Sequence, residues 1–483
     1  LYTLLKQAQK KGTRIVVIDP VKSATAKAFD DYIRIRPSTD GALALAMANT
    51  IIEKDLHDKQ FIEKNVKGFK RFKAYASGFT LKKAEEITGI KAGKIETLAL
   101  AYARADRASI YIGFGMQRYH NGGNAVRCID ALAASTGNIG KKGCGANYAA
   151  KSLSPYLYDL DKKSQVYAKN KRQFIVGKLG DFLEEVQDPP VKAIFVAAGN
   201  PLTQSPDLEK TVKNFSKIDF KVVFDHFMTD TARHADIVIP AAFVFEQDDL
   251  FATSMYSNIL NYSQKAVEPP QGVITEFEFY LALSKKIGLK NLGFTDSEEY
   301  LQKSAHPLLK KLNLDFQQLS GSYLNIKEDE ISWNDKAFET PSRKIELYSE
   351  KAKKDGLSPL PTFIEPWIGM GHFPLRLLTC HTIDSMHSQS FAFNVDKPIV
   401  YVNQKTAEQF LLENESCVFV KGENAKIKAV VCIDEAVYNN TAFIYQGFWH
   451  KSGAVNFLTN SVISDMGKQA AFYDSFCSIE KIK

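Results

Sequence analysis

Two aspartates that lie 206 positions apart, Asp19 and Asp225, each close a short run of β-forming residues. Six residues after each aspartate comes a triplet of Thr, Ala and a basic residue, at 25–27 and at 231–233. In both places an acid, another β-forming run and a proline then follow. A repeat with this long a period cannot belong to a solenoid, so the pattern indicates two related α/β units.

A carboxylate at the end of a strand suits nucleotide recognition. In open parallel sheets, ligands bind beyond the carboxyl ends of the strands. Guanine offers two parallel N–H donors, and a carboxylate can accept such a pair bidentately. The alternative is structural, because an aspartate in this place could instead cap the turn or helix that follows it. Two copies at matched offsets favour the nucleotide, and the capping interpretation stays open.

A glycine-rich stretch from 113 to 123 resembles a dinucleotide-binding loop but departs from it. The third glycine of a GxGxxG pattern would fall at Arg118, where a helix could not pack closely on a strand. The spacing therefore disfavours an NAD site. Gly199-Asn200-Pro201 follows a predicted strand directly, so its backbone N–H groups could meet a pyrophosphate. A plain β-turn explains that triplet equally well.

Histidines and cysteines give no metal site. His381 and His387 are six residues apart, which fits neither one helix face nor a zinc pair and favours a polar loop that hydrogen-bonds a phosphate. The six cysteines include no CxxC pair, which predicts reduced thiols and a cytoplasmic setting, with a periplasmic one left open. Because the sequence contains no HExxH, Walker or Ser–His–Asp pattern, we expect a cofactor to carry the chemistry.

Length and charge limit the classes of protein further. The 483 residues predict several domains, and the net charge of +7 is spread along the chain without a basic block, which disfavours nucleic-acid binding. No run of about 18 apolar residues occurs, so no membrane span is expected.

The order of predicted elements divides the chain into four regions. Strands and helices alternate through 1–150, and after a polar stretch they alternate again to 290, which predicts two α/β domains with parallel sheets (1–150 and 151–290). Residues 291–370 are mixed and connecting. From 371 to 483, five short β runs between turn signals predict a compact β-barrel. They span 375–379, 398–402, 416–420, 425–433 and 441–445.

These landmarks together resemble the molybdopterin oxidoreductases of the dimethyl sulfoxide reductase and formate dehydrogenase type. The resemblance runs over the whole chain, and its motifs stand in family order. They are Val-Ile-Asp19-Pro, Pro-Ser-Thr39-Asp40, Gly-Phe-Gly-Met-Gln117, Thr-Gly137-Asn138-Ile-Gly140, Gly199-Asn200-Pro201, Asp225-His-Phe-Met-Thr229, Ala-Asp236-Ile-Val-Ile-Pro240, His387-Ser-Gln389 and Val-Asn456-Phe-Leu-Thr459.

The resemblance implies two Rossmann-like domains related by the repeat, followed by a double-psi β-barrel that closes over a bis(molybdopterin guanine dinucleotide) cofactor with molybdenum or tungsten. It implies that Asp19, Thr39 and Asp40 serve one guanosine, and that Asn200, Asp225 and Thr229 serve the other. The further cofactor contacts that it implies are Gly115, Gln117, Gly137, Asn138, Gly199, Pro201, His387, Ser388, Gln389, Asn456, Thr459 and Asp465.

Two departures from the family pattern bear on activity. The family's amino-terminal portion, with a [4Fe-4S] cluster in most members and the residue that ligates molybdenum, has no counterpart in this sequence, so we expect the chain alone to be catalytically silent. Formate dehydrogenases place an arginine just after Gly-Val-Asn, whereas Gly145-Ala-Asn147 is followed here by Tyr148, Ala149, Ala150 and Lys151.

This second departure favours oxygen-atom transfer or reduction of a sulfur compound over formate oxidation. A small-molecule substrate and an electron-transfer protein are the expected partners. The rival hypotheses are an inactive remnant without cofactor and a plain nucleotide-binding or NAD-dependent enzyme.

Overall fold

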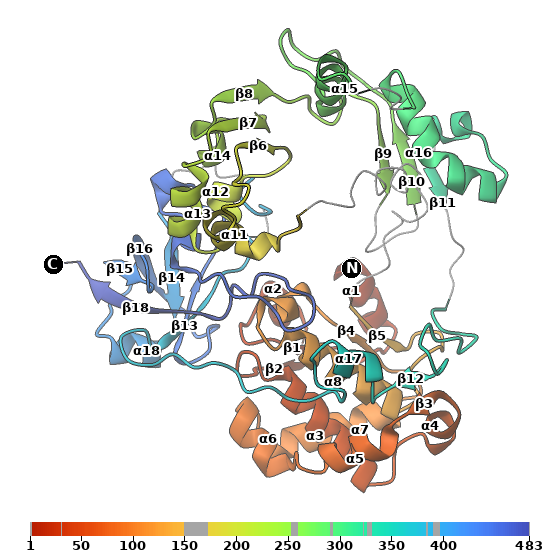
Figure 1. Ribbon diagram of the computed structural model, residues 1–483. Helices are drawn as coiled ribbons and strands as arrows, with labels where there is room; N and C mark the ends of the chain where they lie inside the picture. Colours follow the sequence, from red (N-terminus) through yellow and green to blue (C-terminus); the bar gives the residue numbers. More distant parts are fainter. Residues whose placement is uncertain are drawn as a thin grey trace.

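The computed structural model describes residues 2–29, 31–148, 172–252, 259–289, 293–321, 323–325, 331–382, 385–389 and 397–482. In Figure 1 a blue β-barrel formed by the end of the chain lies at the left, with a yellow-green region of helices and a small parallel sheet above it and an orange region of helices and small parallel sheets to its lower right. Among the described residues, no helix is long and apolar enough to cross a membrane.

The first α/β unit is built around two helices that pack closely. Helix α3 (Asp40–Glu53) buries twelve of its fourteen residues, and it lies against α8 (Gly122–Ser135). A Cβ atom at Gly41 would lie 3.4 Å from the Cα atom of Ala125, so glycine permits this approach. The remaining helices are α1 (Tyr2–Lys10), α2 (Ala24–Ala28), α4 (Lys59–Asn65), α5 (Phe69–Ala76), α6 (Leu81–Thr88) and α7 (Ala92–Arg104).

Two parallel strand pairs complete this unit. β1 (Val16–Ile18) pairs with β2 (Asp31–Ile33), and β4 (Ser109–Tyr111) pairs with β5 (Gly145–Asn147). Strand β4 ends at Tyr111, and a 3-10 helix, η1 (Phe114–Arg118), follows it. The barrel segment pairs with the residues around η1, because Tyr473 and Asp465 donate backbone hydrogen bonds to Arg118 and His120.

The second α/β unit contains a three-stranded parallel sheet in the order β6 (Ala193–Val196), β7 (Phe220–Asp225), β8 (Ile237–Pro240). Its helices are α11 (Leu179–Glu185), α12 (Pro201–Gln204), α13 (Leu208–Phe215), α14 (Asp230–Arg233) and α15 (Glu276–Lys286), with a 3-10 helix η2 (Val176–Lys178). The stretch 151–190 was expected to be irregular, but it contains η2 and α11, and residues 151–171 lie outside the described part.

Both copies of the sequence repeat fold alike. Each is a strand ending in or before aspartate, a short helix and a second strand parallel to the first: β1–α2–β2 and β7–α14–β8. The residue four positions after each aspartate, Ser23 or Thr229, caps its helix by accepting a hydrogen bond from a backbone N–H. The repeat therefore extends from the sequence to the local structure.

Beyond the second unit the connecting region has a core of its own. An antiparallel sheet in the order β11 (Tyr323–Asn325), β10 (Ile259–Ser263), β9 (Asp249–Ala252) packs with α16 (Ser297–Leu312) and a 3-10 helix η3 (Phe316–Leu319). The chain then returns to the first unit, where β12 (Ile345–Glu346) pairs with β3 (Val66–Lys67) and α17 (Glu350–Lys354) follows.

The predicted barrel is confirmed as a closed, six-stranded barrel with parallel and antiparallel neighbours. Apolar residues of all six strands fill its core. In the order around the barrel the strands are β13 (Leu375–Leu378), β17 (Thr441–Ile444), β14 (Ile399–Val402), β16 (Lys426–Ile433), β15 (Cys417–Lys421) and β18 (Ser475–Lys481), with α18 (Gln404–Gln409), η5 (His450–Ser452) and η6 (Val455–Leu458) in the connections. The sequence did not predict β18.

Candidate cofactor site

A cavity of about 860 Å³ lies where the two α/β units and the barrel meet. Its size falls in the range of small-molecule and cofactor sites. The first unit contributes Gln117 and Arg118, and the second contributes the end of β6 and the turn after it. The barrel contributes His387, Gln446-Gly447, Asn456 and 467–470 with Phe472. Of the predicted contacts, Gln117, Gly199, Pro201, His387 and Asn456 line this cavity.

Hydrogen-bond donors gather on the barrel side of the cavity. Arg118 Nη2 lies 3.2 Å from His381 Nε2, and the backbone nitrogen of His387 lies 3.2 Å from His381 Nδ1. A neutral imidazole accepts at only one of its two nitrogens, so at least one of these N–H groups is available to a ligand. Gln446 Nε2 lies 2.7 Å from the same Nδ1. Burial, Arg118 and His387 lower the pKa of His381 to about 4, so this ring is neutral at pH 7. Such a surface suits an anionic group, because a phosphate accepts what these residues donate.

Gln117 is held by a tyrosine. The Tyr148 hydroxyl donates to Gln117 Oε1 (2.7 Å), and Tyr148 packs edge-on against Phe114. With its oxygen engaged, the Gln117 amide has its NH₂ group to offer in the cavity wall.

The first repeat copy presents two neighbouring carboxyl groups. Asp19 Oδ1 accepts from the N–H of Val21 (2.8 Å), and among the described residues its other oxygen takes no hydrogen bond. Burial raises the pKa of Asp19 to about 6, with a smaller contribution from Asp40. Burial likewise raises the pKa of Asp40, the first residue of α3, to about 6. Thr39 is fully buried and donates to the carbonyl of Arg36 (2.7 Å).

The second copy uses its aspartate partly as a turn cap. Asp225 Oδ1 accepts from the N–H groups of His226 (2.8 Å) and Phe227 (3.3 Å), and Oδ2 accepts from Thr229 Oγ1 (2.9 Å). A carboxylate has about four acceptor sites, so one remains after these three bonds. Asp225 therefore does cap the turn that follows it, and its carboxylate keeps one acceptor site for a ligand.

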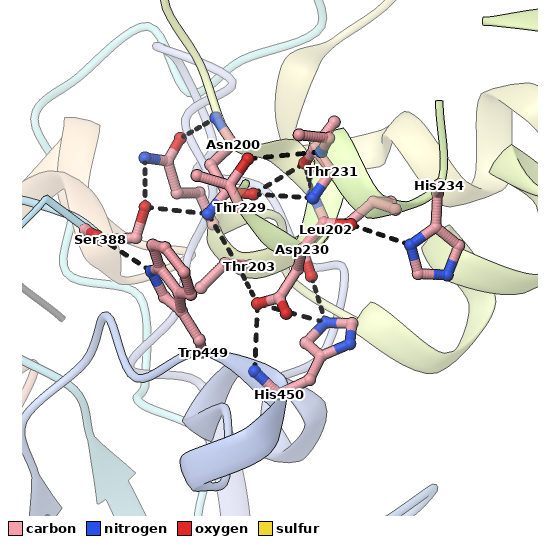
Figure 2. A network of polar contacts seen from close by, with 12 residues as sticks. Asn200, Leu202, Thr203, Thr229, Asp230, Thr231, His234, Ser388, Trp449 and His450 are labelled. Carbon is pink, nitrogen blue, oxygen red and sulfur yellow. Dashed lines mark hydrogen bonds and ion pairs between the residues drawn. The ribbon is translucent and has the colours of Figure 1, made fainter. Parts of the chain in front are cut away.

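The turn after β6 combines a backbone donor with a buried side-chain network. Gly199 and Pro201 line the cavity, and Ala198 has a left-handed backbone (φ 52°). The N–H of Asn200 is donated to Gln204 Oε1 (3.3 Å) and proline has none, so within this triplet the N–H of Gly199 is the donor that could meet an anion. Asn200 points away into a network with Thr203, Thr231 and Ser388 (Figure 2).

Asn456 supplies an orphaned acceptor in the cavity wall. Its Nδ2 donates to the carbonyl of Gln204 (2.8 Å), while Oδ1 is buried without a partner among the described residues. Thr379 and Ser385, which flank the His381 loop, also have buried hydroxyls without partners there. Unpaired buried polar atoms are costly, so a ligand that donates to this wall would remove the penalty.

Several predicted contacts lie away from the cavity. Gly137 and Asn138 end α8, where Gly137 has φ 65° and Asn138 Oδ1 accepts from the N–H of Ala108 (3.3 Å). Asp465 sits at the opposite end of α8 and accepts from the N–H groups of Gly123 (2.7 Å) and Asn124 (3.0 Å). Gly115 lies in η1, and the backbone N–H of Gln389 donates to the carbonyl of Met386 in a turn. Thr459 is buried, and its carbonyl accepts from the N–H of Asp207.

The sequence did not single out Arg118, Gln446 or the 467–472 segment as site residues. Arg118 carried the available signal, because it stands where a dinucleotide loop would need glycine. Among the described residues, no group of three or more His, Cys, Asp or Glu could hold a metal ion.

Comparison with known proteins gives the family. The profile for molybdopterin oxidoreductase matches residues 1–286, and that for the molydopterin dinucleotide binding domain matches 375–476. A probable oxidoreductase of Bacillus subtilis, YyaE, is 32% identical over 100% of this chain and 74% of its own length. The F420-dependent formate dehydrogenase subunit alpha of Methanocaldococcus jannaschii is 27% identical over 99% of this chain and 74% of its own.

A third relative has a different stated activity. The dimethyl sulfoxide/trimethylamine N-oxide reductase of Rhodobacter capsulatus is 27% identical over 93% of this chain and 63% of its own. Acetylene hydratase from Pelobacter acetylenicus has the same fold, with a TM-score of 0.81 over 100% of this chain and 75% of its own, at 24% identity. The chain belongs to the molybdopterin oxidoreductase family, and its barrel matches the molydopterin dinucleotide binding domain of that family.

Proposed function

We propose that this chain holds a bis(molybdopterin guanine dinucleotide) cofactor, with molybdenum or tungsten, for two-electron redox chemistry or oxygen-atom transfer. The observation that carries the proposal is the cavity at the junction of both α/β units and the barrel, with Arg118 and the His381 loop on one side and the Gly199 turn on the other. The internal repeat makes this chain suited to a ligand with two similar halves. The finer fold assignment, two Rossmann-like domains and a double-psi barrel, forms part of the same proposal.

The residues present fit such a ligand. Asp19 and Asp40 would accept the N–H donors of one guanine, and Asp225 with Thr229 would accept those of the other. Arg118, the His387 backbone and the Gly199 turn would hold phosphates, and Gln117 and the unpaired oxygen of Asn456 would face the pterins. When bound, the group supplies the metal and the electron-storing pterins. The chain's own residues bind it, orient it and exclude water around it.

For the substrate we propose an oxygen-atom donor or a sulfur compound rather than formate. A small carboxylate in a buried site needs a cationic partner. Tyr148 brings an uncharged ring beside Gln117, whereas Ala149, Ala150 and Lys151 lie outside the described residues. We further propose a separate electron-transfer protein as partner, since one relative is described as a subunit alpha.

Binding of guanosine diphosphate, followed by isothermal titration, tests the guanine sites. Asp225→Ala should weaken one of two binding events by about 5- to 150-fold, because a lost bidentate base contact costs roughly 1–3 kcal/mol. Adenosine diphosphate should bind far more weakly. Asp219→Ala is the matched control, because Asp219 is exposed just before the opposite end of the same strand and pairs with Lys192. Equal effects of both variants, or no preference for guanine, would refute the assignment.

A further inference from the structure

Asn200 has no hydrogen-bonding capacity left for a ligand. Its Nδ2 donates to Thr203 Oγ1 (2.9 Å) and to Ser388 Oγ (3.2 Å). Its Oδ1 accepts from the Thr231 hydroxyl (2.7 Å) and from the Thr231 backbone N–H (3.2 Å). A primary amide has two donors and two acceptor sites, so all four are used within the protein. The residue is also buried, with 3% of its surface exposed.

The same network ties the second α/β unit to the barrel (Figure 2). Thr203 Oγ1 donates to Asp230 Oδ2 (2.7 Å). Asp230 Oδ2 also accepts from the backbone N–H of His450 (3.0 Å). The His450 ring in turn reaches back to the carbonyl of Leu202 (2.5 Å). Asn200, Thr203, Asp230, Thr231, Ser388 and His450 are called the interunit network below.

The network has no counterpart in the first repeat copy. Thr231 is fully buried, whereas Thr25, its equivalent, is exposed. Ala24 occupies the place of Asp230, so the first copy has no carboxylate there. The two copies share the strand, aspartate and capped helix. The first copy contacts the barrel differently, through the backbone N–H of Lys22, which donates to the carbonyl of Ala436 (2.9 Å). The strand, aspartate and capped helix are thus common to both repeat copies, whereas Asp230 and the buried Thr231 belong to the contact between the second unit and the barrel.

The network also touches the cavity wall. Gln204 lines the cavity, and its side chain is fixed between the N–H of Asn200 (3.3 Å) and Ser388 Oγ (3.1 Å). Its carbonyl accepts from Asn456, the residue with the orphaned oxygen. The position of the Gln204 side chain therefore depends on Asn200 and Ser388, which do not line the cavity themselves.

We propose that Asn200 and Asp230 are positioning residues, which set the cavity wall by fastening the second unit to the barrel, and that the Asn200 side chain does not contact the ligand. The ligand part of this statement rests on the proposed function, whereas the docking part does not. Removing the Asn200 amide would leave the Thr231 N–H without a hydrogen-bond acceptor inside the protein. We therefore expect the contact to loosen both in the second unit and in the barrel.

Amide hydrogen exchange of the ligand-free protein tests the docking. Asn200→Ala and Thr203→Val should each speed exchange at least tenfold in 199–206 and also in 446–459, a barrel segment that contains neither residue. Thr203→Ser keeps the hydroxyl and should behave as the wild type. If Asn200→Ala gives no folded protein, Thr203→Val carries the test alone. Wild-type exchange in 446–459 for the variants that fold would overturn the proposal.

Titration with guanosine diphosphate separates positioning from contact for Asn200, which does not line the cavity, whereas Thr203 does. The two variants should weaken binding alike, and the double variant should be no weaker than either one, because both break one network. Additive losses, or loss for Asn200→Ala with wild-type exchange in 446–459, would mean direct contact and contradict the proposal. If the wild type binds no guanine nucleotide, the proposed function fails, and the exchange data still decide the docking.

Discussion

The acidic residues of the proposed first guanine site are unfavourable for the fold without a ligand. Asp19 and Asp40 have no basic partner among the described residues, and both have a pKa raised to about 6. Between the usual carboxyl pKa, 3.8, and about 6, the folded protein binds more protons than the unfolded chain. Stability must therefore fall as the pH rises through this window, and the cost is complete above it.

Removing one of these charges should stabilise the ligand-free protein. Asp19→Asn keeps the acceptor for the Val21 N–H and removes the buried charge, so we expect the unfolding free energy to rise by roughly 2 kcal/mol at pH 8. At pH 4 the difference should nearly vanish. Thermal unfolding of wild type and variant at both pH values measures it. Asp55→Asn, at an exposed site paired with Lys59, is the control and should give no such gain. Destabilisation by Asp19→Asn at pH 8 would contradict the raised pKa.

Residue types and motif order could predict part of the site. Gln117, Gly199, His387 and Asn456 were predicted from short motifs, and all four line one cavity. Arg118 was marked only as a departure from a dinucleotide loop, and its place in the site could not be predicted, because it lies beside a histidine 263 positions away. Sequence likewise could not show that Asn200 faces inward, since its partners come from a helix in the second unit and a loop in the barrel.

At the scale of elements, local patterns predicted what local interactions determine. The repeat and five of the six barrel strands were expected from periodicity and turn residues. Strand β18 was missed because its partners, β13 and β15, lie far away in the sequence. The interpretation of Asp465 was incomplete for the same reason: its structural partner is the start of α8, more than 340 positions upstream.

Asp465 should matter as a helix cap that docks the barrel. It accepts from two N–H groups at the start of α8 and from Asn124 Nδ2 (2.9 Å), and a negative charge at this end of a helix is favourable. Asp465→Ala should lower the unfolding free energy by about 1–2 kcal/mol and speed amide exchange in 120–128 and 460–474. Asp296→Ala removes the cap of the distant helix α16 and should leave both segments unchanged. Unchanged exchange in Asp465→Ala would show that the docking does not depend on the cap.

At the scale of the whole molecule, the barrel is fastened to both α/β units. A buried ion pair joins Arg376 of β13 to Asp474 (2.5 Å), and Asp474 also accepts from the backbone and ring of His120 in the first unit. His120 stacks on Trp367 of the connecting segment (4.4 Å between ring centroids). The interunit network fastens the other side. The cavity lies between the two attachments, so its shape depends on both.

Loss of Arg376 should weaken the first attachment. Although burial alone would raise the pKa of Asp474, His120 and Arg376 outweigh it and hold the pKa below its usual value. This stability is present above pH 4 and is lost as the pH falls through the lowered pKa. Arg376→Met leaves a buried carboxylate with one partner fewer, at a cost of about 3–5 kcal/mol near neutral pH. Calorimetry should show a lower midpoint at pH 7, and Arg376→Met with Asp474→Asn together should recover part of it. A double variant no more stable than Arg376→Met would contradict this account.

The central claim is that this chain binds a cofactor with two guanine nucleotides. The direct measurement is the nucleotide content of the protein purified from a host that makes molybdopterin guanine dinucleotide. After acid release, chromatography should give about two guanine nucleotides per chain, together with pterin. Asp225→Ala should lower this content, and Asp219→Ala should not. Purified wild type without guanine nucleotide, or with an adenine dinucleotide in stoichiometric amount, would contradict the account.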